Sequence, residues 1–232
     1  IAVDYPGFGM SEKPAPDKYD YFPESHARIL GQVVDALVPG NFSIFVQDWG
    51  GPTGLGMAME RADRVERMYI GNTWAWAADL NTEQGKGMKA FSDNMSEEKN
   101  QKKILEKNLF VRMSMGMLTQ GYKQHGPEVV KQVQAAYQNQ VPDAASRLGI
   151  ATFPKRIIAS TPWLKELDQK MSRLADKPTI LFWGEQDPLF GPGVRKEWES
   201  RLSDYRYVPL PEAKHFFQQD EPERSVSEML KG

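Results

Sequence analysis

Three side chains of this sequence could together carry out a nucleophilic reaction: Asp48, Asp187 and His215. Each follows a short apolar run that is typical of a buried strand, and each lies in a turn-rich stretch. A carboxylate can attack an electrophilic carbon directly, a histidine can activate a water molecule, and a second carboxylate can orient that histidine. These residue types therefore predict nucleophilic catalysis, provided that the fold brings them together.

Asp48 lies in the segment Val46–Gly51, where an apolar strand ends and two glycines open a helix. A strand, a sharp turn and a helix form a nucleophile elbow, which holds a reactive side chain exposed at the carboxyl end of a sheet. Glycine suits such a turn because a Cβ atom would obstruct its backbone conformation. Taken alone, the segment favours a structural role for Asp48 as the cap of the following helix.

Asp187 and His215 also have ordinary explanations when each is considered alone. Asp187 precedes Pro188 after a strand predicted at 179–183, and Asp-Pro commonly begins a turn. His215 follows a strand predicted at 205–209 and lies next to two phenylalanines, where a packed histidine is the usual case. Together, however, the order of nucleophile, acid and histidine resembles that of the α/β-hydrolase triad.

The elements that must position these residues alternate between strands and helices. This alternation predicts an α/β fold with a mostly parallel sheet flanked by helices. Helices are predicted at 23–38 and up to Arg61, and strands at 1–3, 42–46, 68–71, 179–183 and 205–209.

A long block without convincing strands interrupts this alternation and predicts an inserted helical cap. The expected organisation is a first part of the main domain at 1–76, the cap at 77–175 and a second part of the main domain at 176–232.

Composition limits the classes of protein to which this chain could belong. Its 232 residues are 40% hydrophobic and 26% charged, which is typical of a soluble globular protein. A net charge of −2 argues against nucleic acid or an anionic membrane as the main partner. The absence of cysteine excludes disulfides and thiol catalysis, and the three scattered histidines lack zinc-ligand spacing. We therefore expect a mechanism without metal or cofactor and a cytoplasmic location, with an export signal left open.

Taken together, the motifs resemble those of haloalkane dehalogenases, a family of α/β hydrolases. The resemblance covers essentially the whole chain and lies in the segments Asp4–Ser11, Val46–Gly51, Phe153–Arg156, Phe182–Pro188 and Ala213–Phe216. It implies an α/β-hydrolase fold and the hydrolysis of haloalkanes to alcohol and halide. The implied partners are a small halogenated alkane, water and a halide ion, and the oligomeric state stays open.

Carried over position by position, the resemblance implies a role for each candidate residue. Asp48 would be the nucleophile, His215 the general base, Asp187 its orienting acid, and Trp49 a halide-binding donor. Some relatives place the acid as a glutamate after the sixth strand, but that region here contains Asn72, which is expected to be structural. Apolar walls of a substrate pocket are expected from Phe110, Phe153, Phe216 and Leu189.

The chemistry explains why a carboxylate would serve as the nucleophile. A carboxylate with a reference pKa of ~3.9 is ionised at neutral pH, so Asp48 needs no base for the first step. Attack would form an alkyl ester on Asp48, and a fixed N–H donor such as Trp49 would stabilise the departing halide. A neutral His215, oriented by Asp187, would then activate water to hydrolyse the ester.

The chain also departs from the family in its first residues. As the resemblance implies, the family sheet has strands before the one expected at 1–3, and one is followed by a His-Gly-Asn-Pro motif with a second halide donor. Neither appears here. We therefore expect these 232 residues to be an N-terminally incomplete view of a longer protein.

Two other functions remain open at this stage. An epoxide hydrolase also uses an aspartate nucleophile followed by tryptophan, but it needs acidic tyrosines in the cap. Here Tyr122 and Tyr137 are available in weaker contexts, and the chain reads Ala151-Thr152-Phe153-Pro154 where those enzymes tend to place one cap tyrosine. A non-catalytic, ligand-binding relative of the α/β hydrolases is the alternative from a different class.

Overall fold

Four parallel strands form one sheet in the computed structural model, which describes residues 1–231. They are β1 (Phe42–Asp48), β2 (Val65–Thr73), β3 (Thr179–Gly184) and β4 (Tyr205–Leu210), and they lie side by side in chain order. Every residue of β3 is buried, as expected for an inner strand covered on both faces. The parallel sheet predicted from the sequence is confirmed, and its carboxyl ends meet at one edge.

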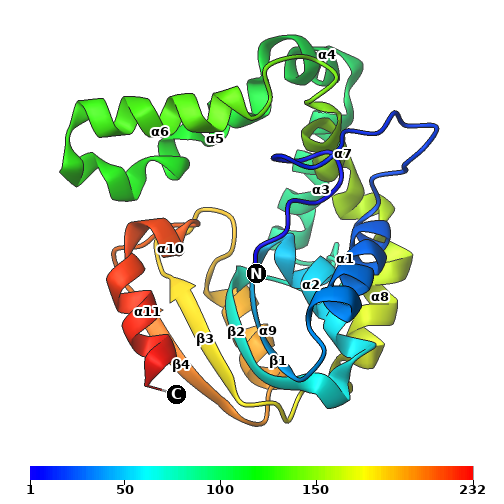
Figure 1. The fold of residues 1–232 in the computed structure, drawn as a ribbon, viewed down its shortest axis with the longest axis vertical. Helices are drawn as coiled ribbons and strands as arrows, with labels where there is room; N and C mark the ends of the chain where they lie inside the picture. The colour runs from blue at the N-terminus through cyan, green and yellow to red at the C-terminus, as the bar shows by residue number, and fades with distance from the viewer. Residues whose placement is uncertain (232) are drawn as a thin grey trace.

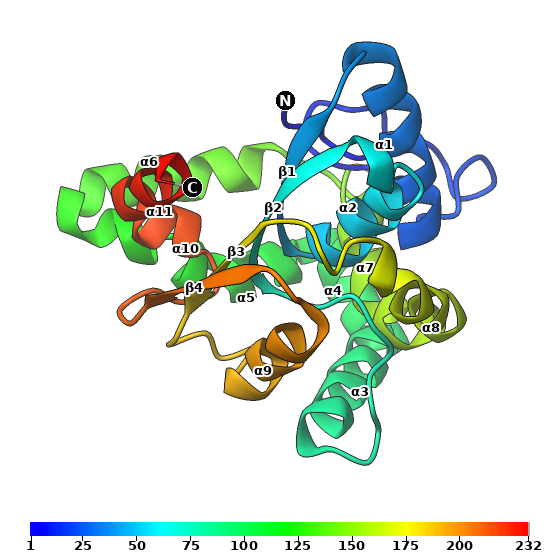
Figure 2. The same cartoon turned by 90° about the horizontal axis from the view of Figure 1, so that it is seen from below.

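Helices cover both faces of this sheet (Figures 1 and 2). One face packs against α1 (Pro23–Leu37), α2 (Gly50–Met59) and α9 (Pro192–Arg201), and the other against α10 (Phe217–Asp220) and α11 (Pro222–Leu230). Strand alternation explains the two cores, because successive side chains point to opposite faces. In β1, Ile44 and Val46 enter the first core, whereas Phe45 packs against Phe217 on the other face.

The stretch between β2 and β3 is helical, and most of it lies over the carboxyl ends of the strands (Figure 1). Its last long helix, α8 (Thr161–Lys170), returns to the sheet and packs Leu164 and Leu167 into the first core. Its α-helices are α3 (Glu83–Ser96), α4 (Glu98–Lys107), α5 (Leu109–Leu118), α6 (Pro127–Asn139), α7 (Leu148–Ala159) and α8 (Thr161–Lys170). Short 3₁₀ turns occur at Ala62–Arg64, Gln120–His125 and Met171–Arg173. The domain boundaries at 76 and 175 stay predictions.

The strand predicted at 1–3 is wrong. Residues 1–3 form no ladder within the described part of the chain, and Ile1 is exposed. A run of three residues can make too few ladder hydrogen bonds to offset the entropy of fixing its backbone.

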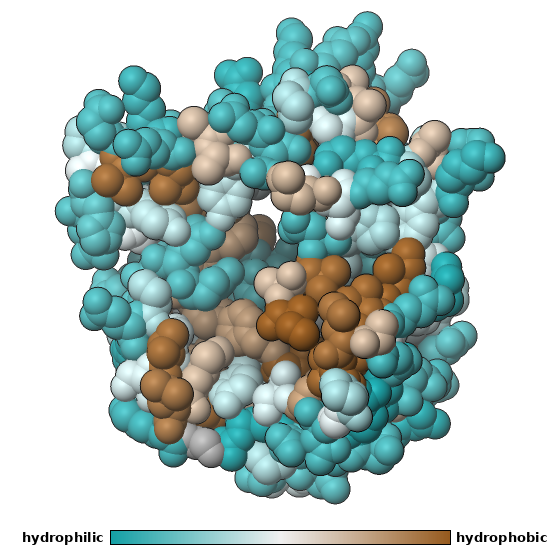
Figure 3. All heavy atoms as spheres, in the orientation of Figure 1, coloured by the Kyte–Doolittle hydropathy of each residue, from teal (hydrophilic) through white to brown (hydrophobic). Residues whose placement is uncertain are grey.

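One edge of the sheet, along β1, pairs with no strand among residues 1–231. An apolar groove of about 640 Å³ runs beside it and is lined by side chains that include Val3, Val33, Val34 and Ile44. Figure 3 shows apolar side chains gathered on this face of the molecule. The expectation of further strands preceding Ile1 stays a prediction.

The helices within residues 1–231 do not combine the length and the apolar character that crossing a bilayer would require.

Candidate active site

Asp48 is held in a strained turn between β1 and α2. Its backbone has φ 47°, in the left-handed region that non-glycine residues rarely adopt. The hydroxyl of Thr73, its partner in the neighbouring strand β2, donates to the Asp48 carbonyl and anchors the turn. A Cβ atom on Gly51 would lie 1.8 Å from that hydroxyl oxygen, so only glycine fits there. This is the conformation of a nucleophile elbow, and Asp48 lines the larger apolar cavity of the molecule.

His215 and Asp187 lie beside Asp48 at the same edge of the sheet. The Nδ1 atom of His215, which follows β4, is 2.9 Å from Oδ2 of Asp187, which follows β3. The Nε2 atom of the same ring is 3.8 Å from Oδ1 of Asp48. The fold therefore brings together the three side chains singled out in the sequence, with the imidazole between the two carboxylates.

Burial and charge set the ionisation of this group. Burial raises the pKa of Asp48, and the nearby His215 charge opposes that shift. For His215, burial alone would lower the pKa, but the Asp187 hydrogen bond and the charges of Asp48 and Asp187 outweigh it and raise the pKa above its usual value. The two carboxylates thus favour an imidazolium ion in the ligand-free protein.

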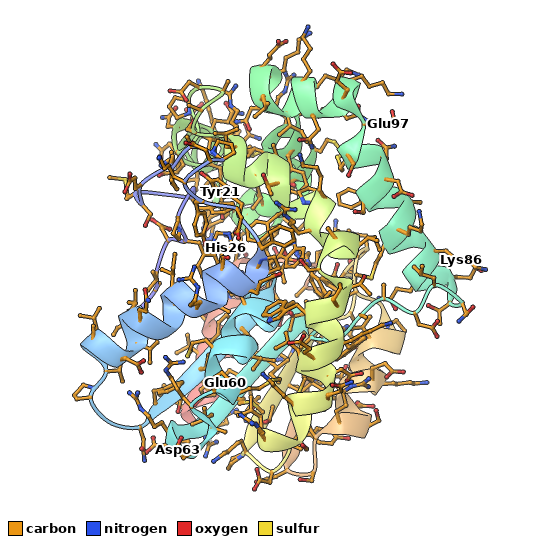
Figure 4. The ribbon with its side chains drawn as sticks, turned by 90° about the vertical axis from the view of Figure 1, so that its right-hand side faces the viewer. Tyr21, His26, Glu60, Asp63, Lys86 and Glu97 are labelled. Carbon is orange, nitrogen blue, oxygen red and sulfur yellow. The ribbon has the colours of Figure 1, made fainter. Side chains whose placement is uncertain are left out.

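The other buried histidine has the opposite electrostatics. His26 on α1 (Figure 4) accepts or donates a hydrogen bond at Nδ1 with the Tyr19 hydroxyl, and burial lowers its pKa to about 4. It is surrounded by aromatic rings, including that of Phe153 at 5.2 Å between ring centroids. His26 is therefore neutral at physiological pH and packs as part of the core.

Asn72 takes a part in the site that the sequence did not reveal. It is fully buried at the end of β2, and its amide donates to Oδ2 of Asp187 at 2.8 Å and to the Gly184 carbonyl at 3.1 Å. Its own oxygen accepts from the Gly184 amide at 2.7 Å. The backbone amide of Leu189 donates to Oδ1 of Asp187, so both carboxylate oxygens are held. Asn72, expected to be structural, thus also holds the carboxylate of Asp187 in place.

Replacing Asn72 with alanine is expected to lower both turnover and stability. Hydrogen bonds to a charged group contribute about 1.5–3 kcal/mol, so the loss should reduce kcat about 10-fold or more and destabilise the fold by a similar free energy. Halide release and urea unfolding would measure the two effects. Asn81→Ala, in an exposed loop, is the control. A loss of stability with unchanged kcat would show that Asn72 does not act through Asp187.

A second polar residue contacts the histidine directly. The Gln47 amide nitrogen lies 3.1 Å from Nε2 of His215 and 3.1 Å from its carbonyl oxygen. Gln47 immediately precedes Asp48 on β1, and nothing in its local sequence distinguishes it from an ordinary strand residue.

An apolar cavity of about 860 Å³ opens above Asp48 and Trp49. The four residues expected to line a pocket, Phe110, Phe153, Leu189 and Phe216, all lie on its wall. Side chains on the wall that were not singled out from the sequence include Phe8, Trp74, Met88, Ile157 and Phe190. Because polar atoms are scarce in its lining, the cavity suits a small apolar ligand whose reactive carbon reaches Asp48.

Trp49 is fixed by aromatic neighbours and is available to a ligand. Its ring stacks on Phe153 at 5.0 Å and meets Trp74 edge-on at 4.8 Å between centroids. Two buried indoles elsewhere, those of Trp183 and Trp198, donate to backbone carbonyls. The Trp49 N–H has no such acceptor within residues 1–231, and its ring lines the cavity. It is thus a rigid donor beside Asp48.

The described residues contain no group of three or more histidine, cysteine or acidic side chains arranged to hold a metal ion.

Comparison with known proteins places this arrangement in a family. The sequence model of the alpha/beta hydrolase fold family matches residues 1–222. The chain is 39% identical over 232 residues to haloalkane dehalogenase 2 of Mycobacterium tuberculosis (strain ATCC 25618 / H37Rv), covering 99% of this chain and 77% of that protein. It is 27% identical to a haloalkane dehalogenase of Psychrobacter cryohalolentis, covering 99% of this chain and 72% of that protein.

Solved structures show the same fold. The haloalkane dehalogenase DbeA from Bradyrhizobium elkani USDA94 superposes with a TM-score of 0.81 at 22% identity, over 98% of this chain and 78% of that one. An epoxide hydrolase from Bacillus megaterium, in its M145A variant, superposes with a TM-score of 0.73 at 18% identity, over 98% of this chain and 81% of that one. At these identities the likeness establishes the architecture alone.

Proposed function

The chain belongs to the haloalkane dehalogenase family of α/β hydrolases, and from this premise we propose that it hydrolyses haloalkanes through a covalent ester on Asp48. The observation that carries the proposal is the carboxylate of Asp48 at the floor of an apolar cavity, beside the indole of Trp49 and 3.8 Å from His215. The products are an alcohol and a halide ion.

The first step is displacement at a saturated carbon. A carboxylate oxygen of Asp48 forms a bond to the carbon as the carbon–halogen bond breaks, and the electron pair of that bond leaves with the halide. The Trp49 N–H donates to the halide as it gains negative charge. Because the cavity is apolar, this donation stabilises the transition state more than it would in water.

The second step is hydrolysis of the ester. A water molecule gives a proton to Nε2 of His215 and attacks the ester carbonyl carbon of Asp48. The tetrahedral intermediate expels the alkoxide, which takes the proton from His215 and leaves as the alcohol. The carboxylic acid formed on Asp48 then releases its proton to solvent, which regenerates the carboxylate. Asp187 accepts from Nδ1 throughout and stabilises the transient imidazolium.

Esterification of Asp48 is expected to lower the pKa of His215. In the free protein the Asp48 charge is one of the effects that raise that pKa, and the ester carries no charge. Hydrolysis of the ester needs the neutral imidazole, so the rate of hydrolysis should rise with pH and level off above the pKa that His215 has in the alkylated protein. When the single-turnover rate of ester hydrolysis is measured against pH, its midpoint should therefore lie below the midpoint of the His215 titration measured by NMR in the free protein. Equal midpoints, or a rate that falls with increasing pH, would contradict this scheme.

Epoxide hydrolysis is the second candidate, because one cap tyrosine lies on the cavity wall. Tyr137 lines the cavity, and its hydroxyl accepts from the Gln219 amide. Burial raises the pKa of Tyr137, which makes it a weaker acid for protonating an epoxide oxygen. Tyr122 does not line this cavity. Among the described residues, the cavity lining therefore supplies a single tyrosine hydroxyl, which is hydrogen-bonded to Gln219, whereas this reaction favours acidic tyrosines.

Product analysis with the full-length protein tests these functions against one another. The substrates are 1-bromobutane, 1,2-dibromoethane and 1,2-epoxyoctane, with halide, alcohol and diol measured in parallel. Halide and alcohol in equal amounts are expected, with little or no diol from the epoxide. Diol without halide would favour the epoxide hydrolase. A folded protein that forms neither product but shows a thermal shift with 1-bromobutane would favour a binding role.

A further inference from the structure

The side-chain amide of Gln47 bridges two atoms of the same histidine. Its nitrogen lies 3.1 Å from Nε2 and 3.1 Å from the carbonyl oxygen of His215, a residue 168 positions further along the chain. Gln47 belongs to β1, whereas His215 lies in the loop after β4, so the amide links the two outermost strands across the carboxyl edge of the sheet. A contact of this kind constrains both the position and the protonation of the ring.

The partners determine which end of the amide faces the histidine. A backbone carbonyl oxygen only accepts, so the group 3.1 Å from the His215 oxygen must be the Gln47 NH₂ and not its oxygen. The second proton of that NH₂ group is then directed to Nε2, which must accept it with a lone pair. At the other side of the ring, Nδ1 faces the acceptor Asp187 and must carry the proton. The two contacts together specify the neutral imidazole with its proton on Nδ1.

We propose that Gln47 is a positioning residue that holds His215 in this neutral form, with Nε2 available as the base for ester hydrolysis. The role in hydrolysis rests on the function proposed above. The preference for the neutral imidazole rests on geometry alone. If Nε2 were protonated, its N–H would face the Gln47 N–H, and the hydrogen bond would be lost.

The other neighbours of the ring act in the opposite direction or carry no charge. Asp187 at Nδ1 and Asp48 at Nε2 both favour the imidazolium. Phe190 and Phe216 cover the ring with uncharged aromatic groups, at 5.7 Å and 4.8 Å between centroids. Burial of the ring also opposes protonation, but among the described polar groups beside its nitrogens Gln47 is the one that does so by hydrogen bonding. Without it, the two carboxylates would keep the base protonated up to a higher pH.

The bond to the carbonyl oxygen gives this arrangement a second property. When Nε2 takes a proton from water, the Gln47–Nε2 hydrogen bond must be released, but the bond to the His215 backbone can remain. The Gln47 amide therefore stays in place during the proton transfer. Its hydrogen bond to Nε2 can form again once the ring has given up that proton. Gln47 acts through His215 and touches no reacting atom of the substrate.

The test compares Gln47→Leu and Gln47→Glu with the parent protein. Leucine removes the donor, and glutamate replaces it with a carboxylate that favours the imidazolium. A hydrogen bond of ordinary strength corresponds to a shift of about 0.5–1 pH unit. The pH midpoint of the His215 titration, measured by NMR, should therefore rise by about that amount in Gln47→Leu and by more in Gln47→Glu. In single-turnover hydrolysis, the pH below which the rate falls should shift upward in the same order. Above that pH, the rates of the variants should stay within about threefold of the rate of the parent protein.

Gln101→Leu is the matched control, because the Gln101 amide also contacts two acceptors, here two backbone carbonyls, but lies in α4, away from the site. It should leave the midpoint unchanged. An unchanged His215 midpoint in both Gln47 variants, or a rate loss that is equal at all pH values, would overturn the proposal. The NMR titration requires no turnover. A parent protein that releases no halide would therefore refute the proposed function and still leave the effect of Gln47 on His215 measurable.

Discussion

Replacing Asp48 with asparagine is expected to abolish halide release while leaving the fold at least as stable as in the parent protein. Without the carboxylate there is no nucleophile to displace the halide, so the rate should fall about 10,000-fold or more. Asparagine is preferable to alanine because it tolerates the positive φ of this position. Halide release from 1-bromobutane measures the loss of activity.

The same substitution tests whether the charged carboxylate of Asp48 lowers the free energy of unfolding. Burial raises the pKa of Asp48, which means that the fold disfavours its charged form. The neutral asparagine should therefore unfold at an equal or higher temperature, and the difference in Tm should grow as the pH rises and the aspartate ionises. A clear decrease in Tm would show that the Asp48 charge supports the fold.

Asp63→Asn provides the control for the loss of one negative charge. Asp63 is exposed in the 3₁₀ turn before β2, and Figure 4 shows it at the end of the molecule far from His26 and Tyr21. It should release halide at the parental rate. Halide release by Asp48→Asn within about tenfold of the parent would exclude Asp48 as the nucleophile.

Replacing His215 with alanine is expected to stop the reaction after its first half. Alkylation needs only the carboxylate and the halide donor, so the variant should release one equivalent of halide in a burst. Hydrolysis of the ester then lacks its base and should slow about 100-fold to 10,000-fold. Mass spectrometry of the intact protein after reaction with 1-bromobutane should find it heavier by one butyl group, and peptide mapping should locate the group on Asp48.

His125→Ala is the matched control, because His125 is an exposed histidine in the 3₁₀ turn Gln120–His125. It should turn over normally and accumulate no adduct. Multiple turnovers by His215→Ala at the parental rate would remove His215 from the mechanism. An adduct on a residue other than Asp48 would remove the proposed nucleophile instead.

Asp48 and His215, whose replacement has the largest expected effects, are residues that local sequence patterns already indicated. Asp48 was found because a strand, a tight turn with two glycines and a helix follow one another within a few residues. His215 and Asp187 were found because each follows a strand, and parallel strands bring their carboxyl ends to one edge. Periodicity of apolar residues and turn chemistry are local properties, and they were sufficient to predict the sheet and to place these three residues just past the ends of strands. The catalytic roles of the three residues stay predictions. The local patterns failed at residues 1–3, where an apolar run pairs with no strand among residues 1–231.

The sequence by itself determined the parallel sheet, the helical stretch between β2 and β3, and the order of carboxylate, carboxylate and histidine along the chain. Only the tertiary structure decided which further side chains touch that group. Asn72 reaches Asp187 across 115 positions, and Gln47 reaches His215 across 168. Each is an isolated polar residue near the end of an apolar strand, which local patterns cannot distinguish from any other. Their roles depend on the distance between side chains of different strands, and that distance exists only once the sheet has formed.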